Sequence, residues 1–167
     1  MKRNKEIEEN VMSNLTHKQL ATECFNKVWD LLEKPNRTEY ETEEMIHLCH
    51  ASFWHWTQVQ DHTEQNLSIG YWQLSRVYGV AANGEQALYY AERCVEISKI
   101  AELAPFYIGY GYEALARSYI LLNQKGSAEE AIIQVKRYIE LVKIEQSKNL
   151  LVVDLADLMK KYHDLYV

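Results

Sequence analysis

Apolar residues recur at steps of three and four along almost the whole chain, and they rarely alternate with polar ones. This spacing is typical of amphipathic helices and not of strands. Only two prolines and six glycines interrupt the chain. Because the links between the apolar stretches are short, neighbouring helices are expected to run antiparallel. The pattern therefore predicts an all-α protein of about seven helices, arranged as stacked helix hairpins.

Start and stop signals give the expected boundaries of these helices. Thr16 with Gln19 and Thr38 with Glu41 have the spacing of capping boxes, and they predict the first two helix starts. Pro35 ends the first helix. Three further starts are predicted at Asp61 with Glu64, at Pro105 and at Ser127 with Glu130. Turns are predicted at Asn83-Gly84 and Lys125-Gly126, and a last amphipathic helix runs from Leu151 to Leu165.

An internal repeat appears when the sequence is shifted by 41 residues against itself. The shift places Tyr71, Leu74, Ser75 and Tyr78 on Tyr112, Leu115, Ala116 and Tyr119, and it places Ala87, Ala91 and Cys94 on Ala128, Ile132 and Val135. Large residues thus recur at large positions and small residues mostly at small ones. This periodicity predicts two hairpins of the same build packed side by side.

The spacing resembles that of the tetratricopeptide repeat, in which a Tyr closes the first helix signature nine residues before the first Ala of the second helix. Tyr78 precedes Ala87 by nine residues, and Tyr119 precedes Ala128 by the same number. The family repeat is about 34 residues long, so this one is longer by about two helical turns. The stretches 50–56, 70–78 and 112–119 are also similar to those of small bacterial repeat proteins without an assigned activity. A weaker likeness links the chain to bacterial peptide-sensing regulators.

The resemblance implies a short tetratricopeptide-like solenoid with the following organisation. Residues 1–13 are expected to be a flexible or frayed segment, and residues 14–167 a single helical domain. Within that domain we expect a degenerate helix pair, two repeat pairs and a capping helix, at 14–60, 61–101, 102–145 and 146–167.

The resemblance also implies where a partner would bind, because the first helix of each tetratricopeptide pair lines a concave face. The side chains expected on that face, with neighbours that complete a groove, are Trp72, Arg76, Tyr110, Glu113 and Arg117, and His55 is a further candidate. Arg76 and Arg117 are repeat-equivalent, and paired guanidinium groups suit carboxylates or phosphates. A purely structural alternative stays open: Glu113 pairs with Arg117 and Arg76 stacks on Trp72.

The histidines suggest a second alternative. His47, His50 and His55 lie close together in the sequence, with His62 just beyond and two tryptophans beside His55. Their helical spacing does not bring three ligands to one face, so no metal or other cofactor is expected. A small-molecule sensor or minor metal-dependent hydrolase using this cluster is nevertheless the runner-up function.

Charge and composition limit the remaining functions. The net charge of −6 argues against nucleic acid or an anionic membrane as the main partner. The three cysteines, Cys24, Cys49 and Cys94, show no metal-binding spacing and are interpreted as small apolar residues in a reducing compartment. No signal peptide, membrane-spanning run or nucleotide-binding or catalytic motif is found, so we expect a cytoplasmic protein that is not an enzyme. The expected function is a scaffold or adaptor that binds a protein or peptide segment, with an anionic group as one option and a homo-oligomer left open.

Overall fold

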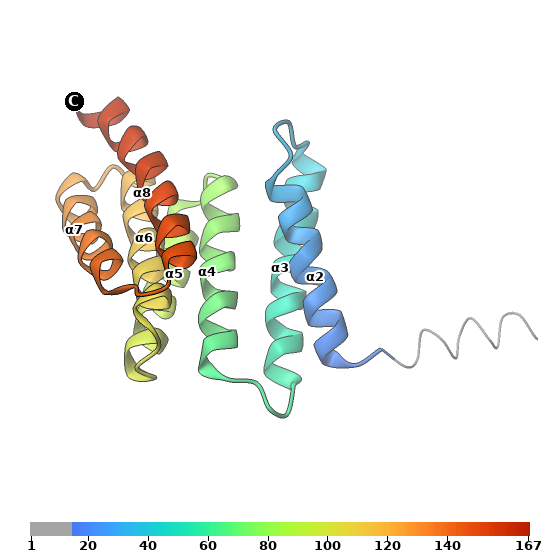
Figure 1. Ribbon diagram of the computed structural model, residues 1–167. Coiled ribbons are helices and arrows are strands. Elements are labelled where there is room, and N and C mark those ends of the chain that lie inside the picture. The colour runs from blue at the N-terminus through green and yellow to red at the C-terminus, as the bar shows by residue number, and fades with distance from the viewer. Residues whose placement is uncertain (1–14) are drawn as a thin grey trace, which may run out of the picture. The chain divides into compact units, whose positions relative to one another are not determined.

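A computed structural model describes residues 15–167, and every regular element in this range is a helix (Figure 1). The elements in chain order are α2 (His17–Leu32), α3 (Glu39–Gln58), α4 (Glu64–Val80), α5 (Gly84–Ile100), α6 (Pro105–Leu121), α7 (Lys125–Leu141) and α8 (Glu145–Tyr166). The all-α prediction of about seven helices, paired as hairpins, is confirmed. The segment 1–13, predicted to be flexible, lies outside the described residues.

The helices divide into two compact units, and the division falls between His62 and Thr63. Unit 1 contains α2 and α3, and unit 2 contains α4 to α8. The division lies close to the boundary expected between the degenerate helix pair and the first repeat pair.

Unit 1 is a single antiparallel hairpin. Its two helices bury a common core of small and medium apolar side chains, Ala21, Val28, Met45 and Cys49. The buried hydroxyl of Ser52 donates a hydrogen bond of 2.8 Å to the backbone oxygen of Ala21 on the other helix. A polar side chain is therefore tolerated in this core because its donor is satisfied.

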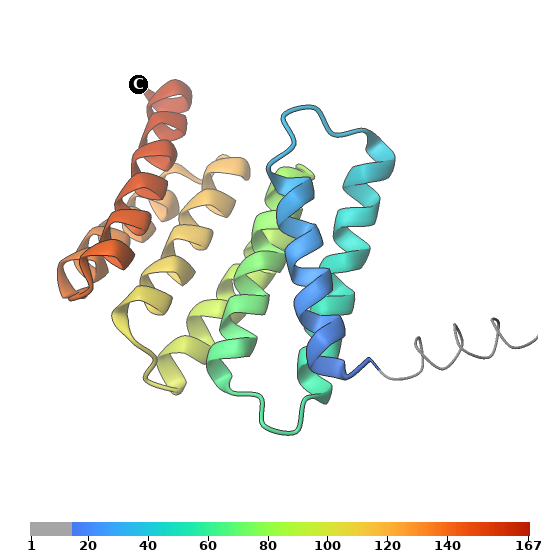
Figure 2. The same cartoon turned by 45° about the vertical axis from the view of Figure 1, so that its right-hand side comes forward.

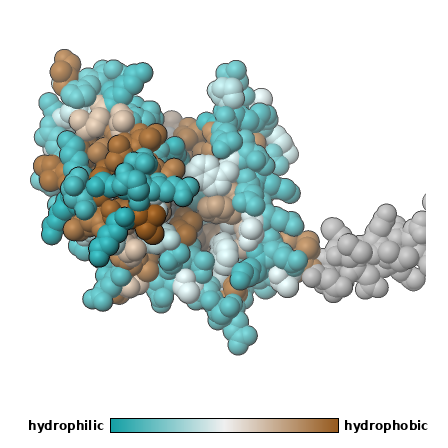
Figure 3. Space-filling view, in the orientation of Figure 1, coloured by the Kyte–Doolittle hydropathy of each residue, from teal (hydrophilic) through white to brown (hydrophobic). Residues whose placement is uncertain are grey.

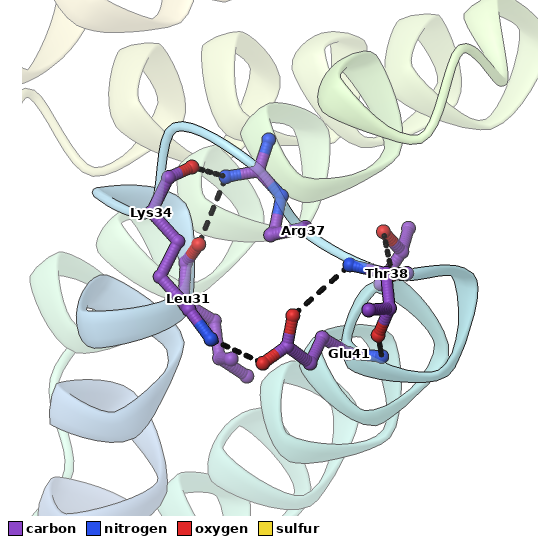
Figure 4. Close-up of polar contacts among 6 residues, drawn as sticks. Leu31, Lys34, Arg37, Thr38 and Glu41 are labelled. Atoms are coloured by element: carbon purple, nitrogen blue, oxygen red, sulfur yellow. Dashed lines mark hydrogen bonds and ion pairs between the residues drawn. The ribbon is translucent and has the colours of Figure 1, made fainter.

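The turn of unit 1 is held by side chains that complete the helix ends (Figure 4). Arg37 donates from Nη1 to the backbone oxygens of Leu31 and Lys34, at 2.8 and 3.0 Å, which satisfies carbonyls left open where α2 ends. Glu41 accepts from the backbone amide of Thr38 and pairs with Lys34. The predicted capping boxes at Thr16 and Thr38 are both present.

Unit 2 is a short stack of helices (Figures 1 and 2). α4, α6 and α8 pack in succession and form one layer, while α5 packs against α4 and α6, and α7 packs against α6 and α8. Ala87, Ala91 and Ala128 are at most 1% exposed, so these small side chains let the helices of each hairpin approach closely. α8 covers the end of the stack with Leu151, Leu158 and Tyr162.

The two hairpins of unit 2 repeat with the step found in the sequence. A shift of 41 residues carries the bounds of α4 onto those of α6 and the bounds of α5 onto those of α7. The turns match as well, because Ala82 and Asn123 both adopt a left-handed backbone, with φ of 58° and 57°. Cβ on Gly111 would lie 2.8 Å from Val95 Cγ2, so only glycine permits this approach of α6 to α5.

Three predicted helix ends are wrong. α4 is capped by Thr63 with Asn66, and not by Asp61 with Glu64. α6 ends at Leu121, and Lys125 begins α7, so Lys125-Gly126 is not the turn. Because α7 begins at Lys125, two residues before the predicted cap, Ser127 lies inside its first turn and makes no cap bond. The cause is the left-handed Asn123, which closes the turn before the serine is reached.

The surface of unit 2 has an apolar region over α8 and its neighbours (Figure 3). Several apolar side chains of α8 point to solvent: Leu150, Val152, Val153 and Leu165. Polar side chains interrupt this region in the figure.

The buried cysteines are protonated and unreactive at neutral pH, since burial raises the pKa of Cys94 to about 11 and raises that of Cys49 strongly. Cys24 is half-buried.

Candidate functional site

The layer formed by α4, α6 and α8 brings together five of the six predicted site residues. Trp72 and Arg76 lie on α4, and Tyr110, Glu113 and Arg117 lie on α6. His55 lies on α3, which belongs to unit 1. The structure therefore defines a cluster in unit 2, called here the arginine cluster, that consists of these five residues and of their partners on α8.

On α4, Arg76 lies against Trp72. The guanidinium carbon is 5.9 Å from the centroid of the indole, which is a cation–π distance. The indole also meets the ring of Tyr110 edge-on, with centroids 5.4 Å apart. Trp72 thus connects α4 to α6 and supports the position of the Arg76 head group.

On α6, Arg117 forms an ion pair with Glu113, one helical turn earlier. The Glu113 side chain is fully buried and that of Arg117 is 16% exposed. Trp72 and Glu113 occupy equivalent repeat positions. The arginine four residues further on therefore forms a cation–π contact in the first hairpin and a buried ion pair in the second. Both contacts of the structural alternative are present, and they leave the binding role of the cluster as a proposal.

α8 adds three charged side chains that the sequence analysis did not assign to the site. Asp154 accepts a hydrogen bond of 2.7 Å from the hydroxyl of Tyr110. Asp157 pairs with Lys161 at 2.8 Å and acts electrostatically on both arginines. The signal that could have found these residues is their spacing of three and four along α8, which places them on one helix face.

Burial and charge set the ionisation of the cluster. Burial, and secondarily the positive charge of Arg76, lower the pKa of Arg117 to about 9, while Asp154 and Asp157 act in the opposite direction. Arg117 is therefore still positively charged at neutral pH. The hydrogen bond from Lys161, followed by charges that include both arginines, lowers the pKa of Asp157. Burial and the bond to Asp154 raise the pKa of Tyr110, which stays a neutral donor.

A nitrogen of the Arg76 guanidinium lacks a hydrogen-bond partner. Nη1 of Arg76 is buried, and among residues 15–167 no acceptor forms a hydrogen bond with it. A buried guanidinium donor without an acceptor is unfavourable by about 1–3 kcal/mol or more. Arg76 therefore has unused donor capacity for a carboxylate, a phosphate or a carbonyl oxygen.

The predicted His55 site has a partner that the sequence did not reveal. Nδ1 of His55 lies 2.8 Å from Nδ1 of His17 on α2, and both rings contact the half-exposed Trp54. Burial and the neighbouring His17 lower the pKa of His55, so the ring is predominantly neutral at neutral pH. The pair joins residues 38 positions apart, which no local spacing rule detects.

Two other histidines have different partners. His47 lies 3.8 Å from Glu43, and Nδ1 of His62 lies 2.7 Å from the backbone oxygen of Val59.

Within the part of the chain that the structure describes, no group of three or more His, Cys, Asp or Glu side chains is arranged to hold a metal ion. None of the described helices combines the length and apolar character needed to cross a membrane.

Comparisons with known proteins add no assignment to this geometry. No family model matches the chain, and neither a curated protein nor a solved structure matches it. The class that the fold defines is a short all-α stack of helix hairpins.

Proposed function

We propose that unit 2 is a tetratricopeptide-like binding module that is not an enzyme and that receives a protein or peptide segment at the arginine cluster. The repeat of helix bounds at 41 residues supports the family likeness, as do the matched left-handed turns. The three cysteines form no disulfide within residues 15–167, which fits a module that works in the cytoplasm, where thiols stay reduced.

The observation that carries this proposal is the state of Arg76. Its head group rests on Trp72, it lies near a second guanidinium, and its Nη1 atom is buried without an acceptor. A carboxylate side chain or chain end of a partner would pair with the partly exposed guanidinium of Arg76 and would offset the repulsion between the two arginines. Trp72 and Tyr110 offer apolar surface beside the charge, which is typical of protein-binding surfaces.

The carboxylates of α8 set the strength and selectivity of this site. Asp154 and Asp157 already offset part of the positive charge of Arg76 and Arg117. An incoming anion therefore competes with them, and we expect moderate affinity that falls as salt rises. Asp154→Asn removes one competitor and is expected to tighten the binding of an anionic segment.

The test compares Arg76→Gln with Arg93→Gln in quantitative pull-downs from the native cell extract. Arg93 is a matched control because its guanidinium carbon also lies 5.9 Å from an aromatic centroid, that of Tyr71, but on α5. We expect Arg76→Gln to lose specific partners by about tenfold or more, which corresponds to about 1.4 kcal/mol, while Arg93→Gln retains them.

Arg117 is unsuitable as the first variant because its loss would strand the buried Glu113 carboxylate. Circular dichroism of each variant controls for folding. If wild type, Arg76→Gln and Arg93→Gln recover the same partners in the same amounts, the arginine cluster is not the binding site.

A further inference from the structure

The tyrosine side chains packed between the two helices of a hairpin differ between the two hairpins of unit 2, and the second hairpin has a groove where the first has a tyrosine ring. In the first hairpin, the ring of Tyr90 on α5 stacks on Tyr71 and on Tyr78, with centroids 6.2 and 5.6 Å apart and planes within 24° and 13°. Tyr71 and Tyr78 are two helical turns apart on α4, about 10.5 Å, so the Tyr90 ring fits between them. The three side chains form a continuous stack.

In the second hairpin the outer rings of this stack are kept and the middle ring is absent. Tyr112 and Tyr119 are the repeat equivalents of Tyr71 and Tyr78, and Ala131 stands at the position of Tyr90. A groove of about 570 Å³ opens there, lined by Tyr112, Leu115, Tyr119 and Ala131 among others. Its volume is within the range of small-molecule sites in proteins.

Tyr138 does not fill this space. Its ring stacks on Tyr112 with centroids 5.6 Å apart. Its Cβ lies 3.3 Å from the position of a Cβ on Gly109, one helical turn before Tyr112 and on the side away from Tyr119. Tyr112 and Tyr119 both line the groove that Tyr138 leaves open, so a planar group that enters it can meet both rings.

The groove carries different charges at its two ends. Lys99 on α5 and Arg137 on α7 line it from opposite walls, near the level of Tyr112 and Tyr138. Ser127 and Glu130, from the first turns of α7, line it near Tyr119. A bound molecule would thus meet two cations at one end and hydrogen-bonding oxygens at the other, with aromatic faces between.

We propose that this groove, called here the tyrosine slot, binds an aromatic ring that carries a carboxylate. The ring takes the place that the Tyr90 phenol has in the first hairpin, between Tyr112 and Tyr119. The carboxylate is received by Lys99 and Arg137, and a hydroxyl on the far edge of the ring donates to Glu130. This site lies on the side of α6 that faces α5 and α7, so it is independent of the arginine cluster.

The test uses 3-(4-hydroxyphenyl)propionate as the probe, with isothermal titration calorimetry and saturation-transfer NMR. The matched ligands are its uncharged amide and 3-cyclohexylpropionate, which keeps the charge but loses the planar ring. We expect saturable binding of the aromatic acid, and affinities lower by about fivefold or more, roughly 1 kcal/mol, for both analogues. Absence of binding at millimolar concentration would overturn the proposal, unless the chain-end peptide described below binds.

Two variants place the ligand in the slot. Ala131→Tyr restores the stack of the first hairpin and is expected to weaken binding of the acid at least about tenfold. Lys99→Gln with Arg137→Gln changes only exposed side chains, and it is expected to weaken the acid while leaving the amide unaffected. Wild-type affinity for the acid in either correctly folded variant would contradict the assignment, and the second variant decides if Ala131→Tyr fails to fold.

A peptide arm distinguishes the two sources of this ligand chemistry. A tetrapeptide that ends in tyrosine with a free carboxylate is compared with its amidated form. Binding of the small acid identifies a free metabolite as a sufficient ligand. Binding of the free-ended peptide alone identifies a chain end, and the proposal of a ring with a carboxylate then holds for that source.

Discussion

The two hairpins of unit 2, α4 with α5 and α6 with α7, have the same helix lengths and turns, but the side chains at their equivalent positions make different contacts. Arg76 rests on Trp72, whereas Arg117 pairs with the buried Glu113. The buried hydroxyls of Ser68 and Ser98 are 2.6 Å apart in the first hairpin, and Gly109 and Ile139 replace them in the second. The repeat thus specifies how the helices pack, whereas the side chains at other equivalent positions make different contacts in the two hairpins.

The largest expected difference concerns the two arginines. Arg117→Met removes the partner of a fully buried carboxylate, and we expect it to lower the free energy of unfolding by about 3–5 kcal/mol. Arg76→Met loses a cation–π contact but also removes a buried donor without an acceptor, so its cost should be below about 1 kcal/mol. Urea denaturation measures both.

A double variant serves as the control for this prediction. Glu113→Gln combined with Arg117→Met removes both charges, and it should be more stable than Arg117→Met alone. Equal costs for the two single arginine variants would mean that the buried pair does not distinguish the hairpins.

The aromatic stack gives the next effect. Tyr90→Ala removes the middle ring between Tyr71 and Tyr78. We expect it to lower the free energy of unfolding by about 2–4 kcal/mol, because removal of a half-buried aromatic ring leaves a cavity. Ala131→Tyr adds the same ring where the groove already exists, so its effect on stability should stay within about 1 kcal/mol. A large destabilisation by Ala131→Tyr in thermal unfolding would show that the second hairpin has no room for the ring.

The buried hydroxyl pair is expected to have a smaller effect. Ser98→Ala removes a hydrogen-bond partner of Ser68, which is 1% exposed. We expect it to lower the free energy of unfolding by about 1–3 kcal/mol. Hydrogen exchange of α4 and α5 amides, compared with those of α6 and α7, locates the loss. Equal increases of exchange in both hairpins would contradict a local effect.

The smallest expected difference lies at the helix starts. Thr63→Ala breaks the capping box of α4 and should cost about 1 kcal/mol. Its repeat equivalent is Ala104, which makes no cap bond. Ser127→Ala should change stability by less than about 0.5 kcal/mol, since Ser127 does not cap α7. A cost for Ser127→Ala as large as that for Thr63→Ala would show that the serine acts as a cap.

Much of the fold could be predicted because it depends on local spacing. The capping boxes at Thr16 and Thr38, the helical periodicity and the step of 41 residues are all found in the structure. The caps at Asp61 and Ser127 were predicted wrongly, since several residues near each helix start have suitable side chains. Which one caps is decided by the turn before it, as the left-handed Asn123 shows for α7.

The candidate site was predicted in part, for the same reason. Arg76 with Trp72 and Arg117 with Glu113 are one helical turn apart, so their contacts follow from spacing alone. Asp154 meets Tyr110 across 44 residues, and His17 meets His55 across 38. Such pairs depend on how helices pack, and a single sequence does not give that packing.

The helices, their antiparallel pairing and the equivalence of the two hairpins follow from apolar periodicity and short connections, which are visible in the amino-acid sequence. Three features depend on how the helices pack: Arg76 lacks an acceptor for one nitrogen, α8 brings carboxylates to both arginines, and a groove lies beside Ala131, the repeat equivalent of Tyr90. Helix formation is governed by neighbours within one or two turns, whereas charge balance and empty space depend on side chains that meet from different helices.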